Sequence, residues 1–144
     1  MASIVEVNIS TQKGVKKTPV HEATFLANYG MADDAHATFG IKRQVSLLSL
    51  DSVQKMRDMG ADVNPGDFAE NLTVEGMELF TLPIGTRLKI GVEAEFVVSQ
   101  IGKECHHGCE IFKQVGKCVM PTEGIFVTVA KDGMVKVGDT VTII

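Results

Sequence analysis

The chain has 144 residues, of which 44% are hydrophobic and 22% are charged, and its formal net charge is −4. These values are ordinary for a soluble globular protein, and this length is enough to bury a hydrophobic core, so we expect a single domain over residues 1–144. The acidic balance and the scattered lysines argue against a nucleic-acid partner, because a general nucleic-acid binder needs many cations to neutralise phosphates.

The N-terminal residues and the cysteine count indicate a compartment. The first eight residues contain no basic region followed by a long apolar run, and no apolar segment is long enough to cross a membrane. We therefore expect a cytoplasmic protein with no signal peptide and no membrane partner. The three cysteines should then be reduced, which favours a ligand or a nucleophile over a disulfide.

Three strands are predicted in the first half of the chain. Alternation of apolar and polar residues over 5–9 predicts a half-buried first strand. Residues 43–48 form an apolar run typical of a buried strand, and residues 68–74 are another strand candidate. Between the first two strands, residues 29–40 show no clean period, which predicts a long functional loop.

A short helix is predicted after residue 50. Asp51 stands at a capping position, and Gln54 follows three residues later, as in a capping box. Apolar residues three apart from Leu50 to Met59 give the segment one apolar side, and Gly60 ends it.

The C-terminal half is predicted to be mostly β. Residues 84–90 and 137–143 echo each other, since each joins a turn glycine to a strand of period two. Residues 95–100 and 124–130 supply two more β-rich runs. Many short strands with few short helices predict a mainly β fold that closes, or nearly closes, into a barrel and so hides its strand edges.

Reactive side chains concentrate in the segment 98–109, which follows a strongly apolar run. Cys105, His106, His107 and Cys109 lie there within five residues. Sulfur and imidazole nitrogen donors packed this closely suit a soft or transition metal. The segment is therefore the first candidate for a functional site.

Cys105 is the central candidate within this segment. Free cysteines are commonly small buried hydrophobes. Here, however, Lys103 and His106 place positive charge or hydrogen-bond donors beside the thiol, which favours the thiolate. A thiolate can serve as a soft metal ligand or as a nucleophile, so composition leaves both roles open.

Cys109 has two interpretations. On a helix it would share a face with Cys105, and the two sulfurs could chelate one metal or act as attacking and resolving thiols. Alternatively it packs inward with the apolar residues that follow. A zinc site with His106 or His107 is a minority interpretation, because adjacent histidines point in different directions and paired Cys-x-x-Cys elements are absent.

Three stretches, taken in order, carry a family resemblance. Residues 34–37 read Asp-Ala-His-Ala and are followed by Arg-Gln-Val-Ser-Leu at 43–47; residues 68–73 read Phe-Ala-Glu-Asn-Leu-Thr; and Cys105 follows Gln100 by five residues. Together they resemble the MOSC domain, the module named after the C-terminal part of molybdenum cofactor sulfurase, and the resemblance covers nearly the whole chain. The loop before the cysteine departs from the family's usual Thr-Gln-Pro-Arg-x-Pro-Cys.

The resemblance implies a β-barrel-like fold with a few short helices and a molybdenum cofactor (molybdopterin) as ligand. It implies that Cys105 binds sulfur or the molybdenum of that cofactor, with Cys109 as a second possible metal ligand. The residues then expected to contact the cofactor are His36, Arg43, Glu70, Asn71, Lys103 and His106.

Two of these positions have a physical interpretation of their own. Asn71 either hydrogen-bonds the backbone of a turn or recognises the polar edge of a pterin ring, which offers donors and acceptors much as a nucleobase does. Arg43 is either a solvated surface charge or a bidentate partner of the cofactor's phosphate.

Three functions follow and stay open at this point. The first is a carrier in cofactor biosynthesis, sulfuration or delivery, with biosynthetic proteins as partners. The second is a molybdenum-dependent reductase of N-hydroxylated compounds, which would need an external electron-donor protein. The third is a zinc or thiol redox module built on Cys105 and Cys109.

Overall fold

Strands dominate the computed structural model, which describes residues 2–10, 18–35, 37–66, 68, 70–102 and 123–144. Its elements follow one another in the order β1 (Ala2–Ile9), β2 (Thr18–Val20), β3 (Glu22–Leu26), β4 (Gly30–Met31), β5 (Val45–Ser49), α1 (Leu50–Asp58), β6 (Leu72–Glu75), β7 (Arg87–Ile90), β8 (Ala94–Ile101), β9 (Ile125–Lys131), β10 (Gly133–Lys136) and β11 (Thr140–Ile143).

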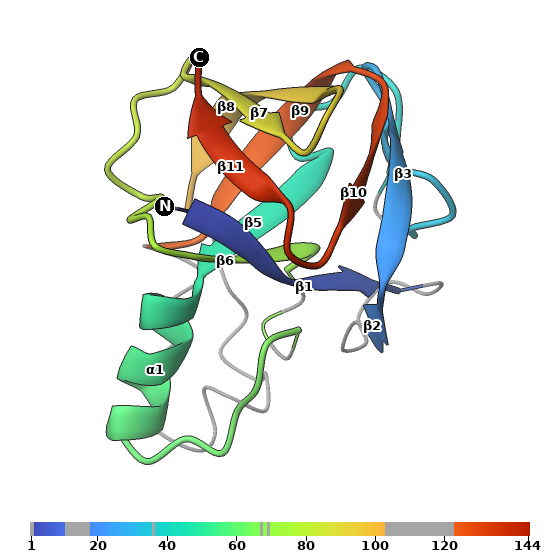
Figure 1. Ribbon diagram of the computed structural model, residues 1–144. Coiled ribbons are helices and arrows are strands. Elements are labelled where there is room, and N and C mark those ends of the chain that lie inside the picture. Colours follow the sequence, from blue (N-terminus) through green and yellow to red (C-terminus); the bar gives the residue numbers. More distant parts are fainter. Residues whose placement is uncertain (1, 11–17, 36, 67, 69, 103–122) are drawn as a thin grey trace.

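Seven strands close into a barrel (Figure 1). Their order is β11-β7-β8-β9-β5-β6-β1, and β11 pairs back with β1 to complete the ring, while β2 extends the sheet beside β1. Neighbouring strands run antiparallel except β5 and β6, which are parallel. The expected mainly β barrel is therefore confirmed.

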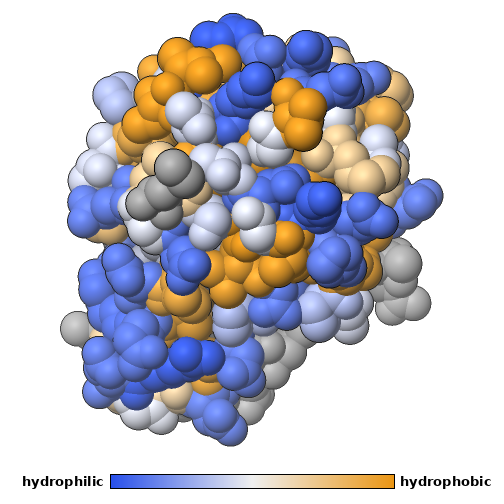
Figure 2. Space-filling model, viewed as in Figure 1, coloured by the Kyte–Doolittle hydropathy of each residue, from blue (hydrophilic) through white to orange (hydrophobic). Residues whose placement is uncertain are grey.

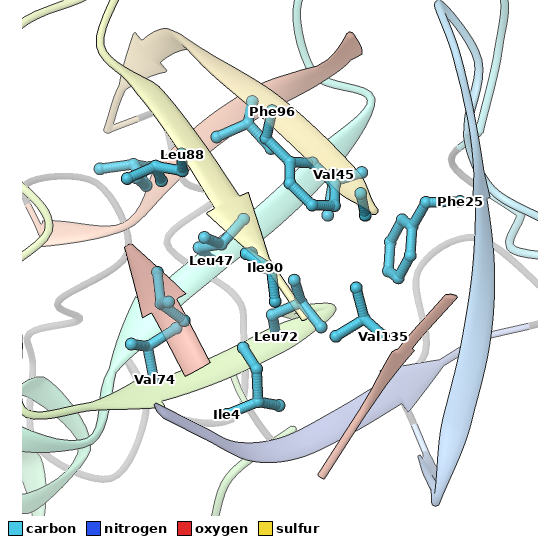
Figure 3. Close-up of a cluster of buried hydrophobic side chains, with 14 of the residues drawn as sticks. Ile4, Phe25, Val45, Leu47, Leu72, Val74, Leu88, Ile90, Phe96 and Val135 are labelled. Carbon is cyan, nitrogen blue, oxygen red and sulfur yellow. The ribbon is translucent and has the colours of Figure 1, made fainter. Parts of the chain in front are cut away.

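Alternating side chains build the barrel's core. On β7, Leu88 and Ile90 are fully buried while Arg87 and Lys89 are exposed, because successive residues of a strand face opposite sides. Figure 3 shows inward side chains of β1, β5, β6, β7 and β8 meeting in the interior, and β9 and β11 contribute to the same core. Each fully buried large aliphatic or aromatic side chain contributes about 1.5–3 kcal/mol relative to exposure, so this interior is the main source of stability.

A small sheet of order β10-β3-β4 packs against one side of the barrel. Its Phe25 meets Phe96 of β8 edge to face, with ring centroids 5.4 Å apart. Val135 of β10 joins the same core (Figure 3). At Gly133 the two layers nearly touch, since a Cβ atom there would lie 2.5 Å from the backbone nitrogen of Ala94.

A second hydrophobic cluster lies between α1 and the outer face of the barrel. It joins residues of α1, the segment 61–68 and strands β5 and β9, namely Leu48, Val53, Met56, Ala61, Val63, Phe68 and Phe126. The opposite side of α1 is mostly hydrophilic (Figure 2), as the predicted one-sided pattern requires. Among the described residues, no helix has the length and apolar character needed to span a membrane.

The helix begins differently from the sequence-based expectation. Ser49 is the N-cap and makes no side-chain capping bond, so Asp51 lies inside the first turn and the predicted cap was wrong. The Ser49 hydroxyl donates instead to the carbonyl of Met77 at 2.7 Å. The predicted end is confirmed: Met59 is the C-cap, and Gly60 has a φ of +100°, a conformation that glycine adopts without strain.

Other predicted elements fit in part. The two echoing segments form β7 and β11, which pair with each other. The predicted strand 68–74 is wrong at its start, because β6 begins only at Leu72. The expected loop 29–40 contains the short strand β4, and strands β2, β3 and β10 were not predicted.

Candidate functional site

Buried polar side chains gather where the end of β1 meets the beginnings of β5 and β6. The register places Val7 opposite Leu72 and Leu47 beside Leu72, so the residues next to them along each strand are neighbours. None of the polar side chains there is more than 6% exposed. We call this group the polar cluster; it consists of Asn8, Ser46, Glu70, Asn71 and Thr73.

Asn71 holds the strands of this region together. Its Oδ1 accepts hydrogen bonds from the N–H of Ser46 at 3.0 Å and from the Ser46 hydroxyl at 3.2 Å, and its Nδ2 donates to the carbonyl of Asn8 at 3.3 Å. The Asn8 N–H donates to the Asn71 carbonyl at 2.7 Å. Asn71 thus bridges β1 and β5 just before β6 begins, and both groups of its amide are engaged within the protein.

Glu70 is a fully buried carboxyl. Its Oε2 accepts a hydrogen bond from the Thr73 hydroxyl at 2.9 Å, while Oε1 has no hydrogen-bond partner among the described residues. Desolvation by burial raises the pKa of Glu70 from 4.5 to about 7, although the N–H groups of Gly66, Glu70 and Phe68 and the Thr73 hydroxyl oppose the rise. With a pKa of about 7, Glu70 is partly protonated and partly ionised near neutral pH.

Besides Ser46 and Thr73, sequence reasoning missed Asn8 as a member of the polar cluster. Its side chain is 0% exposed, yet in the described part of the chain neither Oδ1 nor Nδ2 has a hydrogen-bond partner. Buried amides are normally paired, and an unpaired one calls for an explanation such as a bound water or ligand. The alternation of apolar and polar residues in β1 placed Asn8 on an exposed polar face, so this pattern gave no sign that the side chain is buried.

Arg43 lies on the same side of the barrel. Its side chain is exposed, and its guanidinium carbon stands 5.7 Å from the ring centroid of Phe126. Phe126 is opposite Ser46 in the β5–β9 register, so Arg43 is one strand away from the polar cluster. Stacking on the ring holds the planar guanidinium at the surface, where it is free to meet an anion.

Strands β8 and β9 mark where the cysteine-bearing segment leaves and re-enters the barrel. Ile101 pairs with Ile125, and the Gly102 N–H donates to the Gly124 carbonyl at 2.6 Å. The Gln100 side chain donates to the Gly102 carbonyl at 2.9 Å. The residues that flank the segment 103–122 are therefore held on β8 and β9, and β9 lies beside β5, which bears Ser46 of the polar cluster.

Glu123 anchors the second of these ends to α1. Its carboxylate accepts hydrogen bonds from the Ser52 hydroxyl at 2.7 Å and from the Lys55 ammonium at 2.5 Å. The side chain of Glu123 is only 12% exposed. This contact fixes the start of β9 against the helix.

Several predicted site residues lie outside the described residues and stay predictions. Among the residues that the structure does describe, no three histidine, cysteine, aspartate or glutamate side chains converge as a metal site. Of the six expected cofactor-contacting residues, the structure places Arg43, Glu70 and Asn71, and it brings Glu70 and Asn71 together. The predicted site residues outside the description are His36, Lys103, Cys105, His106 and Cys109.

Solved structures share this architecture. The YUAD protein from Bacillus subtilis is 19% identical and superposes with a TM-score of 0.81, covering 98% of this chain and 94% of that chain. YiiM from Geobacillus stearothermophilus is 19% identical with a TM-score of 0.73 over 100% of this chain and 75% of that one. YiiM from Escherichia coli is 18% identical with a TM-score of 0.70, over 100% and 70%.

The family assignment comes from the sequence itself. No curated protein matches the chain significantly. The family model of the MOSC domain, however, matches residues 34–142, which include α1, strands β5 to β10 and all but the last residue of β11. The chain therefore belongs to the MOSC domain family.

Proposed function

We propose that this protein binds molybdenum cofactor and serves in its biosynthesis, sulfuration or delivery, with Cys105 as the thiolate that holds its sulfur or molybdenum. The observation that carries the proposal is the hydrogen-bonding capacity of Asn8 and Glu70 that is unmet among the described residues. These residues belong to the same barrel as β8 and β9, which flank the segment that bears Cys105. MOSC domains are named after a molybdenum cofactor enzyme, which supports the same ligand.

The polar cluster fits the pterin part of this cofactor. Within the described part of the chain, a buried amide and a buried carboxylate oxygen lack partners, which is costly unless a polar ligand satisfies them. A pterin is a flat heterocycle with several donors and acceptors on its edge, so it supplies the missing partners. The cofactor, when bound, would add a molybdenum centre that holds sulfur and oxygen ligands.

The cofactor's phosphate calls for cations at the surface. Arg43 is exposed and held over the Phe126 ring, where its guanidinium can make two parallel bonds to phosphate oxygens. We assign Lys103, His36 and His106 to the same surroundings as a proposal, and Cys109 as a possible second sulfur ligand. A thiolate at residue 105 gains stability from such positive groups.

Metal and pterin analysis tests the proposal. Protein is purified from a host supplied with molybdenum, and molybdenum, zinc and pterin are measured for the wild type, Cys105→Ser and the matched control Cys118→Ser. We expect about one molybdenum and one pterin per chain in the wild type and in Cys118→Ser. Cys105→Ser should lose most of its molybdenum, because the serine hydroxyl is a harder and weaker ligand for this metal.

Two results would overturn the proposal. Stoichiometric zinc without pterin in the wild type would assign the cysteines to a zinc or redox module instead. Equal molybdenum content in the wild type and Cys105→Ser would remove Cys105 from the site.

A further inference from the structure

The polar cluster contains two buried asparagines with opposite bonding. The amide of Asn71 is used on both sides, by Ser46 and by the Asn8 carbonyl. The amide of Asn8 is used on neither side, and Oε1 of Glu70 is also without a partner among the described residues. The groups still available for recognition are therefore on Asn8 and Glu70, and Asn71 is part of the frame.

The three available atoms form a pattern of hydrogen-bonding capacity. Oε1 of Glu70 is an acceptor when the carboxyl is ionised, Oδ1 of Asn8 is an acceptor, and Nδ2 of Asn8 is a donor. The complement is a ligand edge with two donors followed by one acceptor. The 2-amino group, the ring N3–H and the 4-oxo oxygen of a 2-amino-4-oxopyrimidine ring present that edge.

Strand register makes Asn8 a near neighbour of Thr73, the residue that hydrogen-bonds Glu70. Thr73, whose hydroxyl bonds Glu70, is opposite Glu6 on β1, two residues before Asn8. Asn8 and Thr73 are therefore diagonal neighbours on adjacent strands, about 7–8 Å apart at the backbone. Their side chains leave the same face of the sheet, opposite to Val7 and Leu72.

We propose that Asn8 and Oε1 of Glu70 bind the 2-amino-4-oxopyrimidine edge of a pterin, with Asn8 pairing to N3–H and the 4-oxo oxygen and Glu70 accepting from the 2-amino group. This inference rests on the proposed function and names the part of the cofactor that the polar cluster recognises. Both side chains are fully buried, so the ligand enters only as the chain around the cluster opens, and association is slower than a diffusion-limited encounter.

Direct titration tests the inference without molybdenum. The purified full chain is titrated with pterin, followed by pterin fluorescence, and with lumazine, in which a 2-oxo group replaces the 2-amino group. We expect pterin to bind the wild type and lumazine to bind at least about tenfold more weakly, because its oxygen faces the Glu70 carboxylate. Guanosine presents the same amino, N–H and oxo groups on a purine. Its affinity relative to that of pterin shows whether the site distinguishes a purine from a pteridine ring.

Substitutions separate recognition from folding. Asn8→Leu should weaken pterin binding at least about tenfold while leaving the melting temperature equal to or above that of the wild type, because it removes an unpaired buried amide and keeps a similar volume. Glu70→Gln should also weaken binding, since it replaces the acceptor in part by a donor. Asn64→Leu, at an exposed position, is the control that keeps wild-type binding.

The outcomes distinguish this inference from the proposed function. Wild-type binding of pterin by Asn8→Leu, equal binding of lumazine, or a preference for guanosine over pterin would each overturn it, as would a melting temperature of Asn8→Leu lowered as far as that of Asn71→Leu. Protein that holds molybdenum and pterin in the wild type and equally in Asn8→Leu refutes this inference alone. Protein that binds pterin through Asn8 but never carries molybdenum refutes the proposed function alone.

Discussion

The hydroxyl of Thr73 donates a 2.9 Å hydrogen bond to Oε2 of Glu70 and ties this buried carboxyl to the start of β6. The bond favours the ionised form, yet burial has the larger effect and raises the pKa of Glu70 to about 7. Near neutral pH the Glu70 carboxyl therefore changes between its protonated and ionised forms, and the charge of the polar cluster depends on pH there.

Glu70 should make the protein less stable as pH rises from about 4.5 to 7. In this interval the unfolded chain releases the Glu70 proton, while the folded chain, with its raised pKa, keeps it. The folded state binds more protons, so the free energy of unfolding falls with pH, by about 3 kcal/mol in total. Below about pH 4.5 both states keep the Glu70 proton, so the free energy of unfolding no longer changes with pH through this group. Above about pH 7 both states have released it, and the free energy of unfolding has fallen by the full amount.

Glu70→Gln should remove that slope, because glutamine does not titrate. Urea unfolding at pH 5 and pH 8 gives the change in the free energy of unfolding between the two pH values for each protein. The difference between the wild type and Glu70→Gln is the contribution of Glu70. The expected result is a variant that gains stability relative to the wild type at pH 8. Parallel stability profiles would show that the carboxyl ionises without cost.

Asn71→Ala should lower the free energy of unfolding by about 3 kcal/mol. The substitution removes the bonds to the Ser46 N–H and hydroxyl and to the Asn8 carbonyl, and these buried groups lose the bonds without gaining access to solvent. Asn64→Ala, at an exposed position, should cost less than about 1 kcal/mol. Chemical denaturation measures both, and equal losses would mean that Asn71 does not bridge the strands.

Gly133→Ala should destabilise the contact between β10 and β8. An added Cβ would lie 2.5 Å from the nitrogen and 2.7 Å from the Cα of Ala94, so the two layers must separate, at a cost of about 2–3 kcal/mol. Ala94→Gly should not rescue the variant, because the nearest atoms belong to the backbone. Gly85→Ala, where the added atom meets open space but φ is +97°, should cost only about 1 kcal/mol.

The anchor at Glu123 should depend more on Ser52 than on Lys55. Lys55 is 54% exposed, so Lys55→Met should cost less than about 1 kcal/mol, and the cost should shrink in 1 M salt. Glu123→Ala should cost about 1–2 kcal/mol, since it also leaves the buried Ser52 hydroxyl unpaired. Thermal melts at two salt concentrations compare the variants. A larger loss for Lys55→Met would assign the anchor to charge.

The barrel could be predicted because its strands carry local signals. Leu88 and Ile90 alternate with charged residues, and each echoing segment begins with a turn glycine, so periodicity alone indicated both strands. Strands β3 and β10 lack such signals. They pair with each other across more than a hundred residues, for example Phe25 with Gly133, and tertiary contact rather than local preference makes them strands.

The site could be predicted only in part, because burial of polar groups is a tertiary property. The sequence indicated Glu70 and Asn71 through the family pattern but did not show that Asn71 bridges β1 and β5. Asn8 alternates with apolar residues, which implied a solvated face. In the folded chain both faces of β1 are covered near its end, so Asn8 is buried, and its amide has no hydrogen-bond partner among the described residues. Likewise, Asp51 matched a capping pattern, but β5 runs directly into α1 and makes Ser49 the cap.

Closure of the ring by β1 and β11 also has a consequence for synthesis. Ala2 pairs with Val141 and Ser3 with Thr140. During synthesis β1 can therefore pair with β11 only after more than 130 further residues have been translated. Until then, one edge of β1 is open to pairing with another nascent chain. We expect the yield of folded protein to depend on translation speed and on chaperones that shield this edge, more than its final stability would suggest.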